Sequence, residues 1–334
     1  MTDTPYRLPA TGDATPWIKL DLAPDTTQQF TFAVLSDRTA LPRPGVFERA
    51  VQVTNLLRPD FVMQVGDQIE GYTEDPAELE AMWKEFDAIT DELAMPYFRV
   101  PGNHDVSNEL MRDEWLRRHG VLHYAFRYRD VLFVVLDTQD PPQHADQFNS
   151  KPEARERFAQ FVGLQHDEML RRMTEDLELT QQYVEAATDW EGRMPANLGD
   201  AQVKWARETI AANTDVRWTF LLMHMPAWQV DAAGNPDPQF ARIVEVFADR
   251  PYTALCGHVH NYQRRLIDGR DHIRLGPTGG LWVKSGDEGN FDHVMLVTMT
   301  AGGPVIANVV LDGVLGAEGG AFAVTPRFAP RPAS

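Results

Sequence analysis

Short apolar runs alternate with amphipathic stretches along most of the chain. In residues 45–57 and 76–93, apolar side chains recur every three or four positions, which predicts helices with one buried face. Apolar runs that end abruptly at polar loops predict buried strands. These strands are 30–35, 61–65, 97–100, 131–136, 218–223 and 252–256. The strand–loop–helix order predicts an α/β fold in which part of the sheet is parallel.

After residue 256 the pattern becomes mostly β, and two other segments stand apart. Residues 140–198 are charged and mostly helical in pattern, with an apolar stripe that includes Phe161 and Met173. We interpret them as a helical insertion within a single domain of residues 1–334. The stripe packs against the body or, in the alternative, forms a lid or the contact of a homo-oligomer. Residues 313–334 are rich in Gly, Ala and Pro, which predicts a loose C-terminal extension.

The composition argues against several classes of protein, namely nucleic-acid-binding, membrane and disulfide-rich proteins. The chain has 49 acidic and 31 basic residues, a net charge of −18, which argues against a nucleic-acid-binding patch and an anionic membrane surface. No apolar run approaches the ~18 residues of a membrane span. The single cysteine, Cys256, excludes an internal disulfide framework and fits a reducing compartment. With no apolar segment typical of a signal peptide near the start, we expect a cytoplasmic protein.

Metal-binding side chains follow strand after strand of the predicted fold. They are Asp37, Asp67, Asn103-His104-Asp105, His224, His258 and His260. Taken singly, each has an ordinary structural role, such as a helix cap for Asp37. The carboxyl ends of strands in an open α/β sheet converge on one crevice, so the ordered set predicts one site. Its nitrogen and oxygen donors suit zinc, manganese or iron, and metal ions there would attract an anionic substrate despite the negative net charge.

Five ordered motifs within residues 30–265 resemble the calcineurin-like metallophosphoesterase superfamily. They are Ser36-Asp37, Gly66-Asp67, Gly102-Asn103-His104-Asp105, His224-Met225-Pro226 and Gly257-His258-Val259-His260. The resemblance implies a four-layer α/β/β/α sandwich of two mixed β-sheets flanked by helices. It also implies that phosphoric esters are hydrolysed by a metal-bridging hydroxide at a dinuclear centre.

The same resemblance implies a role for each motif residue. Asp67 would bridge two divalent or trivalent ions, which could be Fe, Mn or Zn. Three residues would complete one site, namely Asn103, His224 and His258. Asp37 and His260 would belong to the other site. His104 would lie beside the substrate phosphate as a charge donor or general acid, and Asp105 would orient it.

The first motif departs from the family pattern. Thr39 stands where the superfamily has a metal-binding histidine, so the first metal loses a donor. Glu70 lies three residues after Asp67, at the spacing from which the purple acid phosphatase branch supplies a tyrosine ligand. A Glu70 ligand would favour iron or manganese over zinc. In the alternative, Glu70 caps the following loop or pairs with Arg38.

Arg38 also has two interpretations. Beside the metals, its guanidinium group could hold a substrate phosphate with two hydrogen bonds. In the alternative it forms a structural ion pair with Glu70 or Glu74. The sequence leaves these two roles open.

We therefore expect a metal-dependent hydrolase that acts on a small phosphorylated substrate. A pyrophosphate-bond hydrolase acting on a nucleotide derivative is the alternative within the enzyme class. A non-catalytic metal-binding scaffold is the alternative outside it, because the first-motif histidine is missing. The sequence leaves open the identity of the metals, the oligomeric state and the choice between monoester, diester and pyrophosphate.

Overall fold

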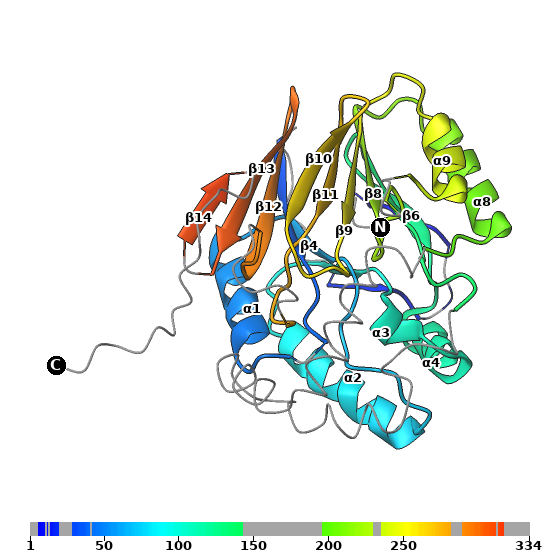
Figure 1. The fold of residues 1–334 in the computed structure, drawn as a ribbon. Helices are drawn as coiled ribbons and strands as arrows, with labels where there is room; N and C mark the ends of the chain where they lie inside the picture. The colour runs from blue at the N-terminus through cyan, green and yellow to red at the C-terminus, as the bar shows by residue number, and fades with distance from the viewer. Residues whose placement is uncertain are drawn as a thin grey trace.

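The computed structural model describes residues 6–10, 12, 14–19, 29–40, 42–142, 196–229, 235–281, 289–311 and 313–316. Within these residues, two seven-stranded β-sheets lie between helices (Figure 1). The β8 sheet contains, in spatial order, β1 (Tyr6–Arg7), β6 (Tyr124–Tyr128), β7 (Val131–Val135), β8 (Trp218–Leu222), β9 (Tyr252–Cys256), β11 (Arg270–Arg274) and β10 (Gln263–Ile267). The β3 sheet contains β14 (Gly313–Gly316), β13 (Gly303–Val310), β12 (His293–Thr300), β3 (Phe30–Leu35), β4 (Phe61–Gln64), β5 (Tyr97–Arg99) and β2 (Trp17–Ile18).

Both sheets are mixed, with parallel strands at their centres. In the β3 sheet, β3, β4 and β5 are parallel, whereas β2 and β12 pair with them in the antiparallel sense. In the β8 sheet, β7, β8 and β9 are parallel, and so are β9 and β11. Parallel neighbours end at the same edge of their sheet, so the loops that follow them gather there. The predicted mixed-sheet architecture is confirmed.

Aromatic rings fill the space between the two sheets. Along β3, the alternate residues Phe30, Phe32 and Val34 belong to this core, while Ala33 and Leu35 face the helices. Phe133 of β7 lies at the centre of the core, where its ring is fully buried. It contacts four other rings, namely Phe32, Phe61, Phe126 and Phe220. The alternation therefore divides each central strand between the inner core and an outer layer.

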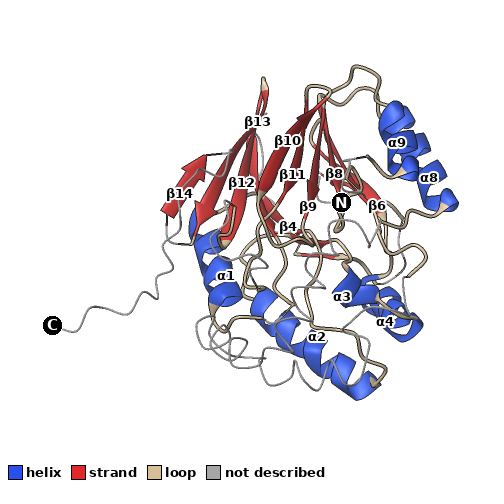
Figure 2. Cartoon of the chain, viewed as in Figure 1, coloured by secondary structure: helices blue, strands red, loops and turns tan. Residues whose placement is uncertain are grey.

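Helices complete the two outer layers (Figure 2). Against the β3 sheet pack α1 (Val46–Leu57), α2 (Pro76–Thr90) and α4 (Glu109–His119). Against the β8 sheet pack α8 (Asp200–Ala212) and α9 (Pro238–Glu245). A single turn of helix, α3 (Asn103–Val106), follows β5. The four-layer α/β/β/α sandwich is thus confirmed. Among the described helices, none has both the length and the apolar character needed to span a bilayer.

The chain ends depart in part from the predicted pattern. The C-terminal extension was predicted to be loose from residue 313, but residues 313–316 form β14, which is paired with β13. Backbone hydrogen bonding to an existing edge strand stabilises a segment whose own sequence lacks periodicity. The rest of the extension, residues 317–334, lies outside the described residues.

The predicted insertion over residues 140–198 lies mostly outside the described residues, which omit 143–195. Its two ends lie side by side. The Asp140 backbone N–H donates to the Asn197 carbonyl at 3.1 Å, and the Asn197 N–H donates to Thr138 at 2.9 Å. The segment therefore leaves and re-enters the body at one place, and the packing of its apolar stripe stays a prediction.

The contribution of the inner aromatic core to stability can be tested by mutation of Phe133. Phe133→Ala should lower the free energy of unfolding by about 3–5 kcal/mol, because a cavity replaces a ring packed among four others. Leu56→Ala on α1 is the control, since that side chain is 82% exposed and should change stability by less than about 0.5 kcal/mol. Urea denaturation followed by circular dichroism measures both. Equal effects would contradict the central role of Phe133.

Candidate metal centre

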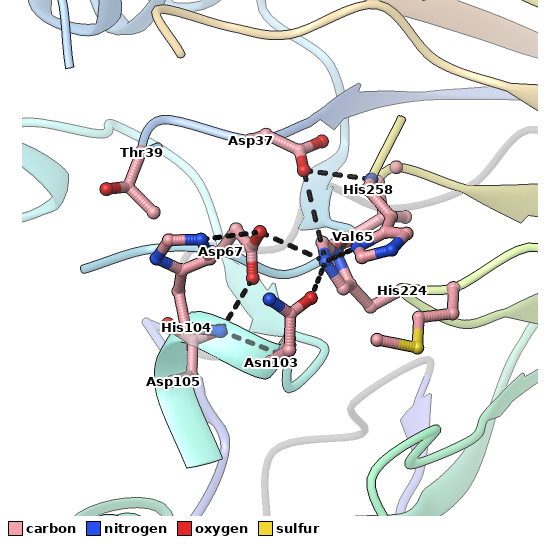
Figure 3. Close-up of polar contacts among 12 residues, drawn as sticks. Asp37, Thr39, Val65, Asp67, Asn103, His104, Asp105, His224 and His258 are labelled. Atoms are coloured by element: carbon pink, nitrogen blue, oxygen red, sulfur yellow. Dashed lines mark hydrogen bonds and ion pairs between the residues drawn. The ribbon is translucent and has the colours of Figure 1, made fainter. Parts of the chain in front are cut away.

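The candidate ligands follow central strands of both sheets. Asp37 follows β3 and Asp67 follows β4, while Asn103 begins α3 just after β5. From the β8 sheet, His224 follows β8, and His258 follows β9. Figure 3 shows these side chains pointing toward one another from separate loops. The β3 sheet thus supplies the oxygen donors, and the β8 sheet supplies the imidazoles.

The backbone is strained where it presents these ligands. Asp67, His258 and His260 have φ values of 52°, 72° and 57°, in the left-handed region that few residues other than glycine adopt. Gly66 has a φ of 94°, and a Cβ atom there would lie 2.4 Å from His224 Nδ1. Strained residues of this kind are retained where surrounding structure holds them for a function.

One group of donors centres on His224. Its Nε2 atom lies 3.1 Å from Asp67 Oδ2, 2.9 Å from Asn103 Oδ1 and 3.3 Å from His258 Nδ1. All four side chains are almost completely buried. On the opposite side of the ring, His224 Nδ1 lies 2.7 Å from the Val65 carbonyl, to which it can donate. When the ring is neutral, that contact keeps the proton on Nδ1 and leaves the Nε2 lone pair available to a metal.

A second group shares Asp67 with the first. Asp37, Asp67 and His260 each offer one ligand atom, and these atoms all lie within 4.8 Å of one another. His260 Nε2 lies 3.3 Å from Asp37 Oδ1, and His260 Nδ1 hydrogen-bonds the Leu281 carbonyl. The His258 backbone N–H donates to Asp37 Oδ1 at 2.8 Å and so joins the two groups.

The carboxylates dominate the electrostatics of the centre. Burial alone would raise the pKa of Asp67, but the nearby imidazoles of His224 and His104 outweigh it and hold the pKa below its usual range. Burial would likewise lower the pKa of His224, yet the charges of Asp67 and Asp37 raise it to about 9. Burial, together with His224, lowers the pKa of His258 to about 3, so that imidazole is neutral. These carboxylates therefore favour a positive charge beside them. A protonated His224 provides that charge here, and a bound metal cation would provide it in the same way.

The donor chemistry fits two metal ions. Asp67, Asn103, His224 and His258 could hold one ion, and Asp37, Asp67 and His260 could hold the other. Carboxylate, amide and imidazole donors together suit zinc, manganese or iron.

The sequence matches the calcineurin-like phosphoesterase family over residues 30–262. The chain belongs to this family. It is accordingly a metallophosphoesterase, a hydrolase of phosphoric esters. The match spans the five motif loops, so family membership and the gathered donor atoms support the same centre.

Solved structures agree on the fold. A dimetal phosphatase from Danio rerio has a TM-score of 0.55 and 14% identity, with 87% of this chain and 99% of that chain covered. The structure of PhoD has a TM-score of 0.53 and 13% identity, with coverage of 92% and 73%. A purple acid phosphatase from yellow lupin (Lupinus luteus) has a TM-score of 0.53 and 12% identity, with coverage of 86% and 52%. No curated protein matches the chain in sequence.

At the first motif of this metallophosphoesterase, Thr39 and Glu70 lie together. The Thr39 hydroxyl donates a hydrogen bond to Glu70 Oε2. Thr39, which stands in the place of the motif histidine, is therefore hydrogen-bonded to Glu70, the residue predicted to supply the missing metal ligand. The side chain of Glu70 lies outside the two groups of donor atoms within 4.8 Å of one another, so its role as a ligand stays a prediction.

Arg38 forms its ion pair with a residue of α2. Its guanidinium group pairs with Glu85 of α2 and lies 5.9 Å from the Phe86 ring centroid. The structure thus places Arg38 in an ion pair, with Glu85 as the partner rather than Glu70 or Glu74. Its predicted contact with a substrate phosphate stays a prediction.

His104 and Asp105 occupy different environments. Asp105 was expected to orient the His104 ring, but its carboxylate accepts backbone N–H groups of Gln68 at 2.8 Å and Gly102 at 2.9 Å. Burial and the charge of Asp67 raise the pKa of Asp105 to about 7. The ring of His104 is instead held by the Glu70 carbonyl, 2.7 Å from Nδ1. Asp105 therefore shapes the loop that carries His104 and does not hold its ring.

Sequence reasoning missed Tyr72, a buried residue beside the centre. Its hydroxyl lies 2.7 Å from Asn103 Nδ2, and its ring packs against the His104 ring. Tyr72 lies five residues after Asp67, beyond the motif itself. The apolar and polar patterns carry no signal that separates it from other loop tyrosines.

The shared position of Asp67 generates a prediction about metal content. Asp67→Asn should lower the metal bound at both positions and abolish activity, because the carboxylate common to both donor groups loses its charge. Asp60→Asn, at the opposite end of β4, is the matched control and should retain the metals. Elemental analysis of the purified variants measures the outcome. Unchanged metal content in Asp67→Asn would contradict a shared ligand.

Proposed function

We propose that this protein hydrolyses a small phosphorylated substrate at a dinuclear metal centre built around Asp67. The observation that carries the proposal is the sharing of Asp67 by two buried groups of donor atoms, with His104 at their side. Bound metal ions would neutralise charge on the phosphoryl oxygens and generate a hydroxide nucleophile near neutral pH. The residues of the chain would hold these ions, bind the phosphate and move protons.

His104 is suited to act on the substrate rather than on the metals. Its backbone N–H donates to Asp67 Oδ1 at 3.0 Å, and its Nδ1 atom faces the Glu70 carbonyl. With Nδ1 carrying a proton for that carbonyl, Nε2 is the atom that lies toward the centre, 4.0 Å from Asp67 Oδ2. We propose that Nε2, when protonated, donates to a phosphoryl oxygen or to the leaving oxygen.

Two other functions compete with this proposal. A pyrophosphate-bond hydrolase would use the same centre on a nucleotide derivative, and the walls of the pocket would decide between the two. A metal-binding scaffold without catalysis has no need for a histidine held beside the metals by two hydrogen bonds, which favours the enzyme. The predicted cytoplasmic location and the predicted lack of nucleic-acid and membrane partners stay predictions.

A substrate panel with a His104 variant tests the proposal. The panel contains an aryl phosphate, a diester and a dinucleotide, and the wild type with Mn²⁺ should hydrolyse the aryl phosphate or the diester. His104→Ala should keep its metals and lose about 10²- to 10⁴-fold in rate, the range typical of a general acid–base group. His123→Ala, a histidine that packs against Trp205, is the control and should keep the wild-type rate.

The outcomes separate the three functions. Hydrolysis of dinucleotides alone would favour the pyrophosphate-bond hydrolase. A wild type that binds metal but hydrolyses none of these substrates would favour the scaffold. Loss of metal in His104→Ala would show that His104 is a ligand.

We further propose that Glu70 supplies the donor missing at Thr39, which would favour iron or manganese over zinc. Glu70→Ala should lose one ion per chain, while the ion at Asn103, His224 and His258 remains. Glu70→Gln should weaken the same ion, because the negative charge is gone. Elemental analysis and Mn²⁺ titration measure these effects.

Glu85→Ala is the control for this experiment. It removes a carboxylate that pairs with Arg38, one residue away from Thr39, and its own side chain is 65% exposed. It should therefore leave both ions in place. Two tightly bound ions in Glu70→Ala would contradict the role of Glu70 as a ligand.

A further inference from the structure

Tyr72 contacts two residues of the candidate metal centre, Asn103 and His104. Its side chain is buried, with only 8% exposed. The hydroxyl oxygen accepts a hydrogen bond from Asn103 Nδ2 at 2.7 Å. The ring meets the His104 ring edge-on, with 4.7 Å between centroids and an interplanar angle of 79°. One tyrosine thus contacts a candidate metal ligand and the proposed proton donor.

The Tyr72 hydroxyl oxygen gives the Asn103 NH₂ group an acceptor. An amide offers a metal only its oxygen, so its NH₂ group must find an acceptor elsewhere. With Nδ2 directed to the Tyr72 hydroxyl, Oδ1 faces His224 Nε2 at 2.9 Å, as Figure 3 shows for the Asn103 and His224 side chains. A flipped amide would present hydrogens to the donor atoms and repel a cation.

The backbone around Tyr72 is fitted closely to the loop it supports. A Cβ atom on Gly71 would lie 1.7 Å from the His104 carbonyl oxygen, so the two segments touch at a position that only glycine tolerates. Tyr72 itself has a φ of 50°, an unusual value for a bulky aromatic residue. Such a conformation persists where surrounding contacts hold it, so the tyrosine has a defined position relative to His104.

We propose that Tyr72 is a positioning residue of the metal centre. Its hydroxyl directs the Asn103 amide oxygen toward the metal, and its ring limits the rotation of His104. The inference rests on the proposed metal centre, but it concerns metal affinity and does not depend on the identity of the substrate. Partners that orient metal ligands in this way typically contribute 10- to 100-fold to metal affinity or activity.

Titration of the full chain with Mn²⁺ tests the hydroxyl. Tyr72→Phe keeps the ring and removes the acceptor of the Asn103 N–H. It should weaken one of the two Mn²⁺ ions by about 10- to 100-fold and leave the other unchanged. Tyr128→Phe is the matched control. It removes another buried hydroxyl, which donates to Asp60 near the start of β4, and should bind both ions as the wild type does.

A second background distinguishes positioning from general damage to the fold. In Asn103→Ala the amide is gone, so the Tyr72 hydroxyl has no metal ligand to orient. Adding Tyr72→Phe to Asn103→Ala should therefore change Mn²⁺ affinity by less than about 3-fold, as expected for two residues that act through one interaction. Equal loss in both backgrounds would overturn the inference.

A third variant tests the ring. At saturating Mn²⁺, Tyr72→Leu should lower kcat further than Tyr72→Phe, because His104 loses its neighbour. Equal Mn²⁺ affinity in the wild type and Tyr72→Phe would overturn the inference and leave the proposed function intact. A wild type that binds no Mn²⁺ would overturn both.

Discussion

Two buried carboxylates, Asp37 and Asp67, impose the main constraint on this structure. Both side chains are almost inaccessible to water, and an isolated carboxylate in such a place is strongly disfavoured. Imidazoles surround them, with His260 near Asp37 and His224 near Asp67. Two metal ions would satisfy the same charges more completely. The loops that meet here, with their left-handed residues and close-packed glycines, are arranged around this concentration of negative charge.

The two sheets contribute unequal parts of the centre, which makes their packing functionally important. The oxygen donors come from the β3 sheet, whereas His224 and His258 follow strands of the β8 sheet. The distances between these sets therefore depend on how the sheets lie against each other. The aromatic core between them, with Phe133 among four rings, determines that relation. A small shift of one sheet would separate imidazoles from carboxylates, so rigidity of the core serves the site directly.

Glu70 contacts both Thr39, where the first motif departs from the family pattern, and His104, which matches that pattern. Its carboxylate accepts a hydrogen bond from Thr39, and its backbone carbonyl holds the His104 ring. Tyr72, two residues further on, contacts Asn103 and the same histidine ring. This one loop after β4 therefore contacts Thr39 of the first motif, the candidate ligand Asn103 and the proposed proton donor. Because the first-motif histidine is missing, a ligand from this loop would replace the lost metal donor at a position close to Thr39.

The sequence by itself determined the central strands and the order of the ligands, because both are local. Short apolar runs mark β3 and β7 wherever these strands pack, and each ligand follows its strand within a few positions. The tertiary structure alone decided the contacts between distant segments. Arg38 pairs with Glu85, 47 residues away, and Glu70 replaces Asp105 as the partner of the His104 ring. Spacing along a chain does not specify which loops meet, since that depends on how helices and sheets pack.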